Sequence, residues 1–444
     1  MLVLEAAETA GGGMRSAELT LPGFTHDVCS AIHPWPLASP FLRTLPLEEH
    51  GVELVHPPAP LAHPFDDGAT ALLERSIDAT GASLGDDAAS WARLMEPFVR
   101  SADTLLAGAL APPVPPRHPL AIARFGLHGL RSASGLARAR FRGERARGLF
   151  AGLAAHSMLA LSAPVSASFG LMLAVVGHAF GWPFIRAGSQ RLADGLVSYL
   201  RSLGGEIETG RPVESLDELP PARAVLLDLT PRGVARLAGS RFSTRYRRRL
   251  ERYRYGPGVF KLDWALDRPV PWRNSECTTA ATVHLGATLP EIEASEDAVS
   301  RGEHPERPFV LLAQQSLFDP SRAPAGKHTL WAYCHVPSGS TVDMTEQIEG
   351  QIERFAPGFR DLVISRRAMT AAEVESYNPN YVGGDINGGL QDLRQLLARP
   401  VPRLVPYSTP DSSIFICSSA TPPGGGVHGM CGYFAAQAAL RSLR

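Results

Sequence analysis

Lysine is almost absent from this chain, so arginine supplies nearly all of its positive charge. Only Lys261 and Lys327 occur among the 43 basic residues, and the formal net charge of the 444-residue chain is −1. A chain without an excess of positive charge exerts no broad electrostatic attraction on nucleic acid. We therefore expect no nucleic-acid partner.

Paired cysteines and sustained apolar runs are also lacking. The five cysteines include no C-x-x-C pair, so the sequence indicates neither a zinc site nor a disulfide framework, and we expect no metal. Residues 166–184 come nearest to a membrane span, but Gly170, His178 and Pro183 interrupt them, and they fall short of about 20 apolar residues. We expect a buried helix beside an apolar cavity in a cytoplasmic protein, with peripheral contact with a membrane as an alternative.

The chain further lacks the glycine loop that usually precedes an acid such as Glu5. Residues 1–5 read as a buried strand ending in that acid, and a glycine-rich run with Arg15 follows at once. In a dinucleotide-binding βαβ unit, such an acid binds the adenosine ribose, and a G-x-G-x-x-G turn lies roughly 20 residues before it. Only four residues precede Glu5. We therefore expect a chain that begins inside a nucleotide site, with the first strand, glycine turn and helix missing.

The remaining pattern mixes helices and strands without a regular β-α alternation. Apolar residues at helical spacing predict helices over about 80–108, further helices to about 180, and helices over 190–203, 345–355 and about 427–440. Apolar runs predict strands at 206–208, 224–229, 259–266, 281–285, 309–316, 329–336 and 414–417. The four strands between 259 and 336 should form a mostly antiparallel sheet. Ser189 is a candidate helix N-cap, and residues 111–119 read as a linker or rigid turn.

The C-terminal end holds a strand followed by three glycines and a helix. The strand at 414–417 leads through Gly424, Gly425 and Gly426 into the last predicted helix. Glycines let a backbone approach a flat ligand closely, and a helix start offers unpaired N–H groups and partial positive charge. Aimed at the edge of a flavin ring, this arrangement would stabilise the charge gained on reduction. We favour that interpretation over an ordinary strand-turn-helix corner, for which one glycine would suffice.

Six segments occur in an order that is similar to one family of flavoproteins. They are Glu5 and residues 12–15, 23–27, 188–190, 383–386 and 423–429. The ordered set covers essentially the whole chain and resembles the phytoene-desaturase-type flavoproteins, the carotenoid and retinoid branch of the FAD-dependent amine-oxidase superfamily. It also resembles the pyridine nucleotide-disulfide oxidoreductase domain-containing members of that group.

The resemblance implies an α/β fold with FAD as cofactor. A discontinuous Rossmann-like FAD-binding domain of the p-hydroxybenzoate-hydroxylase type would be interleaved with a substrate domain of helices and a mostly antiparallel sheet. The FAD-binding domain would comprise 1–75, 181–258 and 376–444, and the substrate domain 76–180 and 259–375. The FAD-binding residues implied are Glu5 at the adenosine ribose, Arg15 against the pyrophosphate with Gly12 and Gly13 beside it, Val213 at adenine through its backbone, the tail glycines Gly424, Gly425 and Gly426, and Gly429 and Met430 at the isoalloxazine.

Two polar segments are candidates for chemistry at a flavin. His26 and Asp27, with Cys29 and His33 nearby, would supply a general base if they are buried with perturbed pKa values. The alternative, which we favour, is a hydrogen-bond network within a loop. Asp385 would lie near the flavin by resemblance, and its alternative is a double turn held by side-chain hydrogen bonds. A hydrocarbon substrate needs no dedicated base, because the cofactor carries the chemistry.

A basic run at 241–254 has two interpretations as well. Its seven arginines, interspersed with aromatic residues, would suit RNA or an anionic membrane surface. Tyr246, Leu250 and Tyr253 recur at helical spacing, however. We favour a helix with a buried apolar face and a solvated basic one.

The sequence supports three functional hypotheses. The first is an FAD-dependent oxidoreductase that transfers hydride between C–C bonds of a hydrophobic, isoprenoid- or lipid-like substrate and flavin, with an electron acceptor that no motif identifies. The second is a cofactor-less, non-catalytic interaction protein of the same fold, and the third is a flavin-dependent isomerase. No G-x-x-x-x-G-K-[ST] or G-x-S-x-G motif occurs, which argues against a P-loop NTPase or an α/β-hydrolase.

Overall fold

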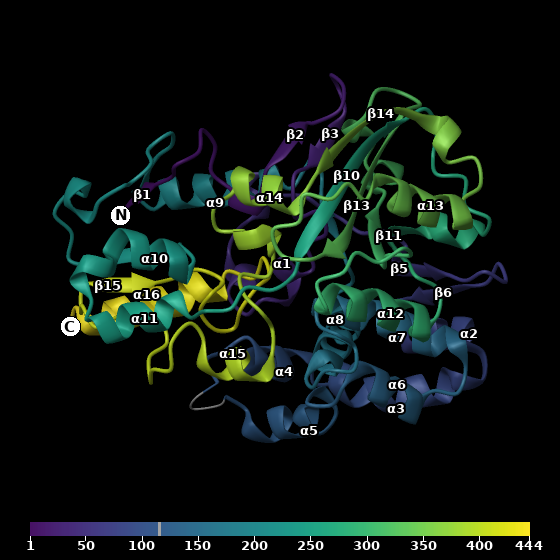
Figure 1. The fold of residues 1–444 in the computed structure, drawn as a ribbon, viewed down its shortest axis with the longest axis horizontal. Helices are drawn as coiled ribbons and strands as arrows, with labels where there is room; N and C mark the ends of the chain where they lie inside the picture. Colours follow the sequence, from purple (N-terminus) through teal and green to yellow (C-terminus); the bar gives the residue numbers. More distant parts are fainter. Residues whose placement is uncertain (114–116) are drawn as a thin grey trace.

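A seven-stranded sheet occupies the middle of the computed structural model, which describes residues 1–113 and 117–444 (Figure 1). Its strands, in spatial order, are β14 (Val363–Met369), β10 (Gly258–Leu266), β13 (His328–Val336), β12 (Val310–Ala313), β11 (Ala280–Leu285), β5 (Ala59–Pro64) and β6 (Thr70–Leu73). All neighbours are antiparallel except β5 and β11, which run parallel. The predicted, mostly antiparallel sheet is therefore confirmed, with three strands added to the four that the sequence indicated.

Helices pack against the sheet and bury its central strands. The helical layer between the N-terminal strands and the later ones comprises α2 (Ile77–Leu84), α3 (Ala88–Val99), α4 (Ala102–Ala109), α5 (Pro119–Gly129), α6 (Ala133–Arg140), α7 (Glu144–Ala155) and α8 (Ser166–Phe180). Further along the chain, α12 (Leu289–Ser300) lies against α7 and β13, and α13 (Thr345–Phe355) packs near β10 through Trp264. Every residue of β10 is buried as a result.

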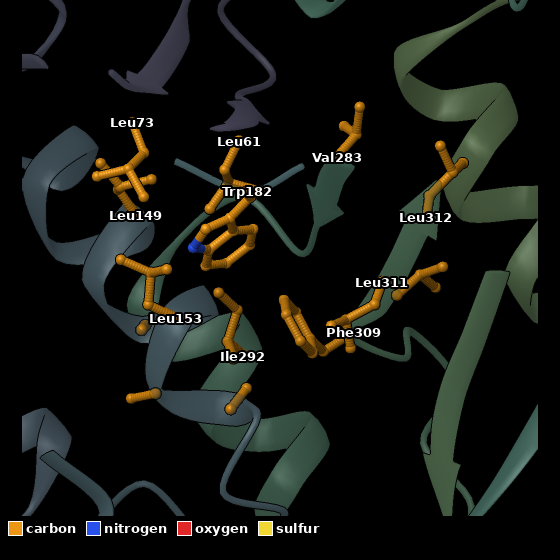
Figure 2. Close-up of a cluster of buried hydrophobic side chains, with 14 of the residues drawn as sticks. Leu61, Leu73, Leu149, Leu153, Trp182, Val283, Ile292, Phe309, Leu311 and Leu312 are labelled. Atoms are coloured by element: carbon orange, nitrogen blue, oxygen red, sulfur yellow. The ribbon is translucent and has the colours of Figure 1, made fainter. Parts of the chain in front are cut away.

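The contact between α7 and the sheet forms much of the apolar core (Figure 2). Leu149 and Leu153 of α7 lie beside Leu61 of β5 and Trp182, and each of these residues is at most 3% exposed. Burying one such leucine contributes about 1.5–3 kcal/mol to folding. This core holds the two layers in register.

The helical region predicted over about 80–108 is confirmed, and it consists of several helices. The structure breaks it into α2, α3 and α4, because Gly85 adopts φ +62° after α2 and Ser101 interrupts the chain after α3. The helix predicted within 166–184 is confirmed as the largely buried α8. Among the described residues, no helix is both long enough and apolar enough to cross a membrane. The linker predicted over 111–119 includes residues 114–116, which lie outside the described part of the chain.

Two short parallel strand pairs form the Rossmann-like part of the fold. β1 (Leu2–Leu4) pairs with β8 (Glu206–Glu208), and β15 (Ile414–Ile416) pairs with β9 (Val225–Leu227). We expected β1 and β9 to be buried, and this is wrong for part of each strand, since Leu2 is 37% and Leu226 is 38% exposed. Each lies in a two-stranded sheet, which leaves more of its surface open than the middle of a larger sheet would.

Helices follow these strands. They are α9 (Gln190–Ser202), α10 (Pro231–Ala238), α11 (Thr244–Glu251) and α16 (Met430–Ser442). Ser189 precedes α9 as predicted, but its hydroxyl does not cap the helix and instead donates to the Ser30 carbonyl at 2.7 Å. Tyr246 and Leu250 of α11 are buried, so the helix with a solvated basic face is the interpretation that the structure confirms.

Short antiparallel pairs and helices complete the chain. The remaining strands are β2 (Ser16–Glu18) with β3 (Thr25–Asp27) and β4 (Leu54–Val55) with β7 (Phe184–Ile185), and the remaining helices are α1 (Trp35–Ala38), α14 (Ala371–Tyr377) and α15 (Leu393–Ala398). The domain prediction placed β5 and β6 in the segment 1–75, but β5 pairs with β11 of the other predicted domain and β6 pairs with β5. The division into two domains stays a prediction. In the structure, β5 and β6 belong to the same sheet as the strands of the other predicted domain.

Candidate functional site

Two acids meet where the parallel strands end. Glu5 follows β1 and Asp228 follows β9, and Glu5 lies close enough to raise the pKa of Asp228. Burial is the larger cause, and together they bring the Asp228 pKa to about 6. The side chain is nevertheless reachable by solvent, and neither of its carboxylate oxygens accepts a hydrogen bond from a described residue. In open parallel sheets, ligands bind at the carboxyl ends of the strands.

Glu5 is held in place by Arg15. Arg15 Nη2 donates to Glu5 Oε1 at 3.3 Å, the Ala7 N–H donates to the same oxygen at 2.8 Å, and Arg15 Nε donates to the Thr9 carbonyl at 2.9 Å. No described residue donates to Glu5 Oε2. The structure thus brings the predicted ribose and pyrophosphate residues together and leaves one carboxylate oxygen for a ligand.

Two tyrosines close this site from the side of α14. Tyr377 Oη donates to the Gly12 carbonyl at 3.2 Å, and the Arg15 guanidinium lies 5.7 Å from the centroid of the Tyr377 ring. A Cβ on Gly13 would lie 1.9 Å from Tyr381 Oη. Gly13 therefore has to be glycine for Tyr381 to approach. We call Glu5, Arg15, Asp228, Tyr377 and Tyr381 the strand-end cluster.

The tail glycines pack against protein atoms. A Cβ on Gly424 would lie 2.4 Å from Arg399 Nη1, one on Gly425 would lie 2.6 Å from the Asn387 carbonyl oxygen, and one on Gly426 would lie about 3.1 Å from His428 Cδ2. Gly424 and Gly426 also have positive φ angles of 118° and 122°. The ordinary strand-turn-helix corner explains all three glycines, so their contact with a ligand stays a prediction.

One of the N–H groups at the start of α16 already has a hydrogen-bond acceptor within the chain. Gly429 occupies the N-cap position with φ +69°, and the Met430 N–H donates to His428 Nδ1 at 3.1 Å. A contact between the Met430 N–H and a flavin would compete with this hydrogen bond. The predicted roles of Gly429 and Met430 remain predictions.

Asp27 is saturated with hydrogen-bond donors. Its Oδ1 accepts from Ser16 Oγ and from the Ser189 N–H, each at 2.7 Å, and its Oδ2 accepts from Gln315 Nε2 and Arg322 Nη1, each at 3.0 Å. Burial alone would raise the pKa of Asp27, but Arg322 and the hydrogen bonds hold it below its usual value. A carboxylate with four donors has no free lone pair for a substrate proton. The geometry supports the network interpretation rather than a general base.

His26 belongs to a second buried polar group, which the sequence analysis did not identify. Lys261 and Asp263 form a buried ion pair on β10, and His26 Nδ1 lies 3.6 Å from Asp263 Oδ1. Burial and the Lys261 charge lower the pKa of His26 to about 3, whereas burial raises that of Asp263 to about 6 in spite of Lys261. Asp263 can therefore take up or release a proton near neutral pH, which is typical of functional sites. We call these three residues the β10 polar group.

Cys29 links the two clusters. The charges of Lys261, Asp263 and Arg15 all act on its thiol, whose pKa is raised to about 11 mainly by burial. The β10 polar group and the strand-end cluster are thus neighbours across Cys29. A signal for the former was present in the sequence: Lys261 and Asp263 alternate within an apolar strand, in a chain with two lysines. Asp228, Tyr377 and Tyr381 carried no such signal.

Asp385 and Val213 lie outside both clusters. The Asp385 carboxylate accepts from the N–H groups of Gly256, Asn387 and Gly389 at 2.7 to 2.8 Å, which is the double-turn interpretation. Burial raises the pKa of Asp385, and these three donors oppose the rise. Val213 is half-buried in the loop after β8, and its backbone N–H and carbonyl form no hydrogen bond to another described residue.

Comparison with known proteins identifies relatives of this chain. No protein-family model matches it. It is similar to pyridine nucleotide-disulfide oxidoreductase domain-containing protein 2 of Rattus norvegicus, with 27% identity over 320 residues that cover 62% of this chain and 54% of the rat protein. The mouse protein is 26% identical over the same length. The chain therefore spans about half the length of the curated relatives it matches. The similarity to this group, expected from the motifs, is found, whereas the phytoene-desaturase type stays a prediction.

Solved structures of oxidoreductases share the fold over nearly the whole chain. An oxidoreductase from Methanosarcina mazei aligns with a TM-score of 0.65 at 15% identity, covering 98% of this chain and 93% of that one. Cyclohexylamine oxidase from Brevibacterium oxydans aligns with a TM-score of 0.59 at 14% identity, covering 100% of this chain and 94% of that one. These likenesses confirm the predicted α/β fold class, with its Rossmann-like part and multistranded sheet.

Proposed function

We propose that this chain is an FAD-dependent oxidoreductase of the phytoene-desaturase type, which transfers hydride between C–C bonds of a hydrophobic, isoprenoid- or lipid-like substrate and flavin. The observation that carries the proposal is the meeting of Glu5, Arg15 and Asp228 at the carboxyl ends of β1 and β9. The oxidoreductase fold supports it. The chain spans about half the length of the curated relatives it matches. The activity that we assign to the whole protein is therefore a proposal.

The residues present fit the adenosine half of FAD. Glu5 Oε2 and both oxygens of Asp228 are acceptors without a donor among the described residues. Ribose hydroxyl groups are donors that match them. Arg15 supplies the positive charge that a pyrophosphate requires.

FAD, when bound, supplies the hydride chemistry. Glu5 would orient the ribose, and its bond to Arg15 holds the guanidinium toward the phosphate. Tyr377 and Tyr381 fix the 12–13 turn beside that guanidinium. Asp263, paired with Lys261 in the neighbouring β10 polar group, could exchange a proton close to neutral pH. The apolar residues of α7 and α8 would exclude water from a hydrophobic substrate.

Two measurements on the purified chain test the proposal. Its visible spectrum, recorded before and after incubation with FAD and gel filtration, should show bound flavin. Calorimetric titration with ADP should show binding, and Glu5→Gln should weaken it by roughly 10-fold or more, since a hydrogen bond to a charged group contributes about 1.5–3 kcal/mol. Glu8→Gln, at an exposed acid three residues away, is the matched control. Absence of both flavin and ADP binding would refute the proposal.

A cofactor-less protein of the same fold is the second candidate. The packing of Gly424, Gly425 and Gly426 against protein atoms favours it, because these glycines are explained without a ligand. Loss of flavin from the gel-filtered protein together with no response to ADP would support this candidate. A flavin-dependent isomerase would use the same site, and it would turn over substrate without consuming an electron acceptor.

A further inference from the structure

The positive charge of this chain is concentrated in one segment. Residues 104–143 contain six arginines and neither aspartate nor glutamate, in a chain whose net charge is −1. All six arginines follow α4, and the described part of the segment beyond that helix includes α5 and α6. Such a block of one sign typically marks an interaction surface.

Most of these arginines have no carboxylate partner. Arg138 forms an ion pair with Glu293. Within the described ranges 1–113 and 117–444, Arg117, Arg124, Arg131 and Arg140 form none. Burial lowers the pKa of His128, and the charges of Arg140, Arg131 and Arg124 lower it further, so all three charges act on this end of α5. Unbalanced charges brought together in this way attract an anionic partner.

The same helix exposes large apolar side chains. Leu120 is 86%, Leu127 is 74% and Leu130 is 57% exposed, whereas Phe125 and Gly129 face the protein. The exposed leucines recur at helical spacing, and Arg124 shares that spacing, four residues after Leu120 and three before Leu127. Figure 1 shows α5 at the outer edge of the helical layer, away from the sheet. A row of solvent-facing leucines on a surface helix calls for a partner.

We propose that the outer face of α5 and its C-terminal end, formed by Leu120, Leu127 and Leu130 with Arg124 and with Arg140 of α6, docks onto the surface of an anionic lipid bilayer. Leucines on one face of an interfacial helix insert into the boundary of the acyl chains, and flanking arginines pair with lipid phosphates. Nucleic acid would match the arginines but would leave the leucines in water. A second copy of this chain, with its net charge of −1, would not match the block of positive charge. The anionic bilayer matches both.

The other basic helix of the molecule provides an internal comparison. α11 also exposes arginines, among them Arg245, Arg248 and Arg249, but its apolar residues Tyr246 and Leu250 are buried. It therefore lacks side chains that could insert into a bilayer. Only α5 combines the two requirements among these two helices.

Co-sedimentation of the purified chain with vesicles tests the proposal. We expect binding to vesicles of equal parts phosphatidylglycerol and phosphatidylcholine and much weaker binding to phosphatidylcholine alone. Leu120→Ser with Leu127→Ser, and separately Arg124→Glu, should each reduce the partition coefficient by roughly 5-fold or more. The matched controls are Leu203→Ser, at a leucine that is 68% exposed on another surface, and Arg248→Glu on α11, and both should bind as the unaltered chain does.

Several outcomes would overturn the proposal. These are no binding to the anionic vesicles, binding that Arg248→Glu reduces as much as Arg124→Glu does, or binding that the two leucine changes leave intact. Analytical ultracentrifugation tests whether a second copy of the chain occupies this face. If the chain forms a dimer that Leu127→Ser dissociates, the face serves self-association. Binding of a duplex oligonucleotide that depends on Arg124 but not on Leu127 would assign it to nucleic acid. Circular dichroism of each variant confirms that it is folded.

Discussion

Arg322 and Asp27 form a buried ion pair of 3.0 Å across 295 residues of chain. Arg322 also donates to Asp319 Oδ2 at 3.1 Å and to the Ile185 carbonyl at 2.8 Å. Asp27 in turn receives donors from β2 and from the residue before α9. One guanidinium therefore ties the β2–β3 hairpin to β7 and to the end of the sheet. The polar run at 23–27 is thus a structural junction in this chain.

Replacing Arg322 should destabilise the fold strongly. Arg322→Met leaves the buried Asp27 carboxylate without its cation, and breaking a buried pair in this way costs about 3–5 kcal/mol. Urea unfolding followed by tryptophan fluorescence measures the change. The control is Arg43→Met, whose pair with Asp103 is exposed and should contribute about 0–1 kcal/mol. Equal losses in the two variants would contradict the role assigned to Arg322.

Stability should fall steeply as the pH drops below 6.5. Burial lowers the pKa of His26 and His156 to about 3 and that of His33, His63, His178 and His428 to about 4. The unfolded chain binds protons at these sites from about pH 6.5 downward, whereas the folded chain does not, so acid favours unfolding. Asp263, whose pKa is raised to about 6, acts in the opposite direction. The buried histidines outnumber this carboxylate, so the net effect of acid is a loss of stability.

The urea midpoint, measured from about pH 7 to about pH 4.5, tests this expectation. His178→Gln should flatten the dependence by about 1.4 kcal/mol per pH unit, because one titrating site is removed. The glutamine oxygen can still accept the 3.0 Å hydrogen bond that Trp91 Nε1 donates to His178. A midpoint independent of pH over this range would show that the buried histidines are protonated in the folded state.

Two helical glycines should respond in opposite directions to the same substitution. A Cβ on Gly148 in α7 would lie 2.4 Å from the Ala287 carbonyl oxygen, so Gly148→Ala should cost about 1–3 kcal/mol of stability. Gly350 in α13 has open space around its Cβ position, so Gly350→Ala should stabilise by about 0.5–1 kcal/mol through helix propensity. Thermal unfolding of the two variants measures both. A destabilised Gly350→Ala would be unexpected.

The Gly13–Tyr381 approach can be isolated by a double-mutant cycle. Gly13→Ala places a methyl group 1.9 Å from Tyr381 Oη and should destabilise the chain. The same change in a Tyr381→Phe background should cost less by about 1 kcal/mol or more, because the nearest remaining ring atom is 3.2 Å away. Additive losses would mean that Tyr381 moves aside freely and does not shape the 12–13 turn.

The sequence predicted those elements whose own apolar pattern indicates which residues are buried. The apolar runs of β10, β11, β12 and β13 and the amphipathic pattern of α13 gave strands and a helix close to their observed bounds. β5, β6 and β14 were not assigned to the sheet, since the partner of a strand is decided by packing and not by its own residues. α12 was missed because four acids lie within its twelve residues and blur its apolar stripe.

The candidate site shows the same division. Glu5 and Arg15 could be placed together because only ten positions separate them in the sequence. Asp228, Tyr377 and Tyr381 reach them from other segments, and nothing in their local sequence marks that convergence. The tail glycines suggested a ligand, yet each fills a steric requirement set by Arg399, Asn387 or His428. A glycine pattern indicates that other atoms come close to the backbone, but it does not tell whether those atoms belong to a ligand or to the protein.

The parallel pairing of β5 with β11 affects how the chain is made. Ala59 on β5 lies beside Ala280 on β11, and ribosomes add about 5–20 residues per second. The β5–β6 hairpin therefore leaves the ribosome roughly 10 to 45 s before its neighbour does. Its buried face, which includes Leu61 and Leu73, lacks its β11 neighbour throughout that interval. The seven-stranded sheet can therefore be completed only after the ribosome has passed β11.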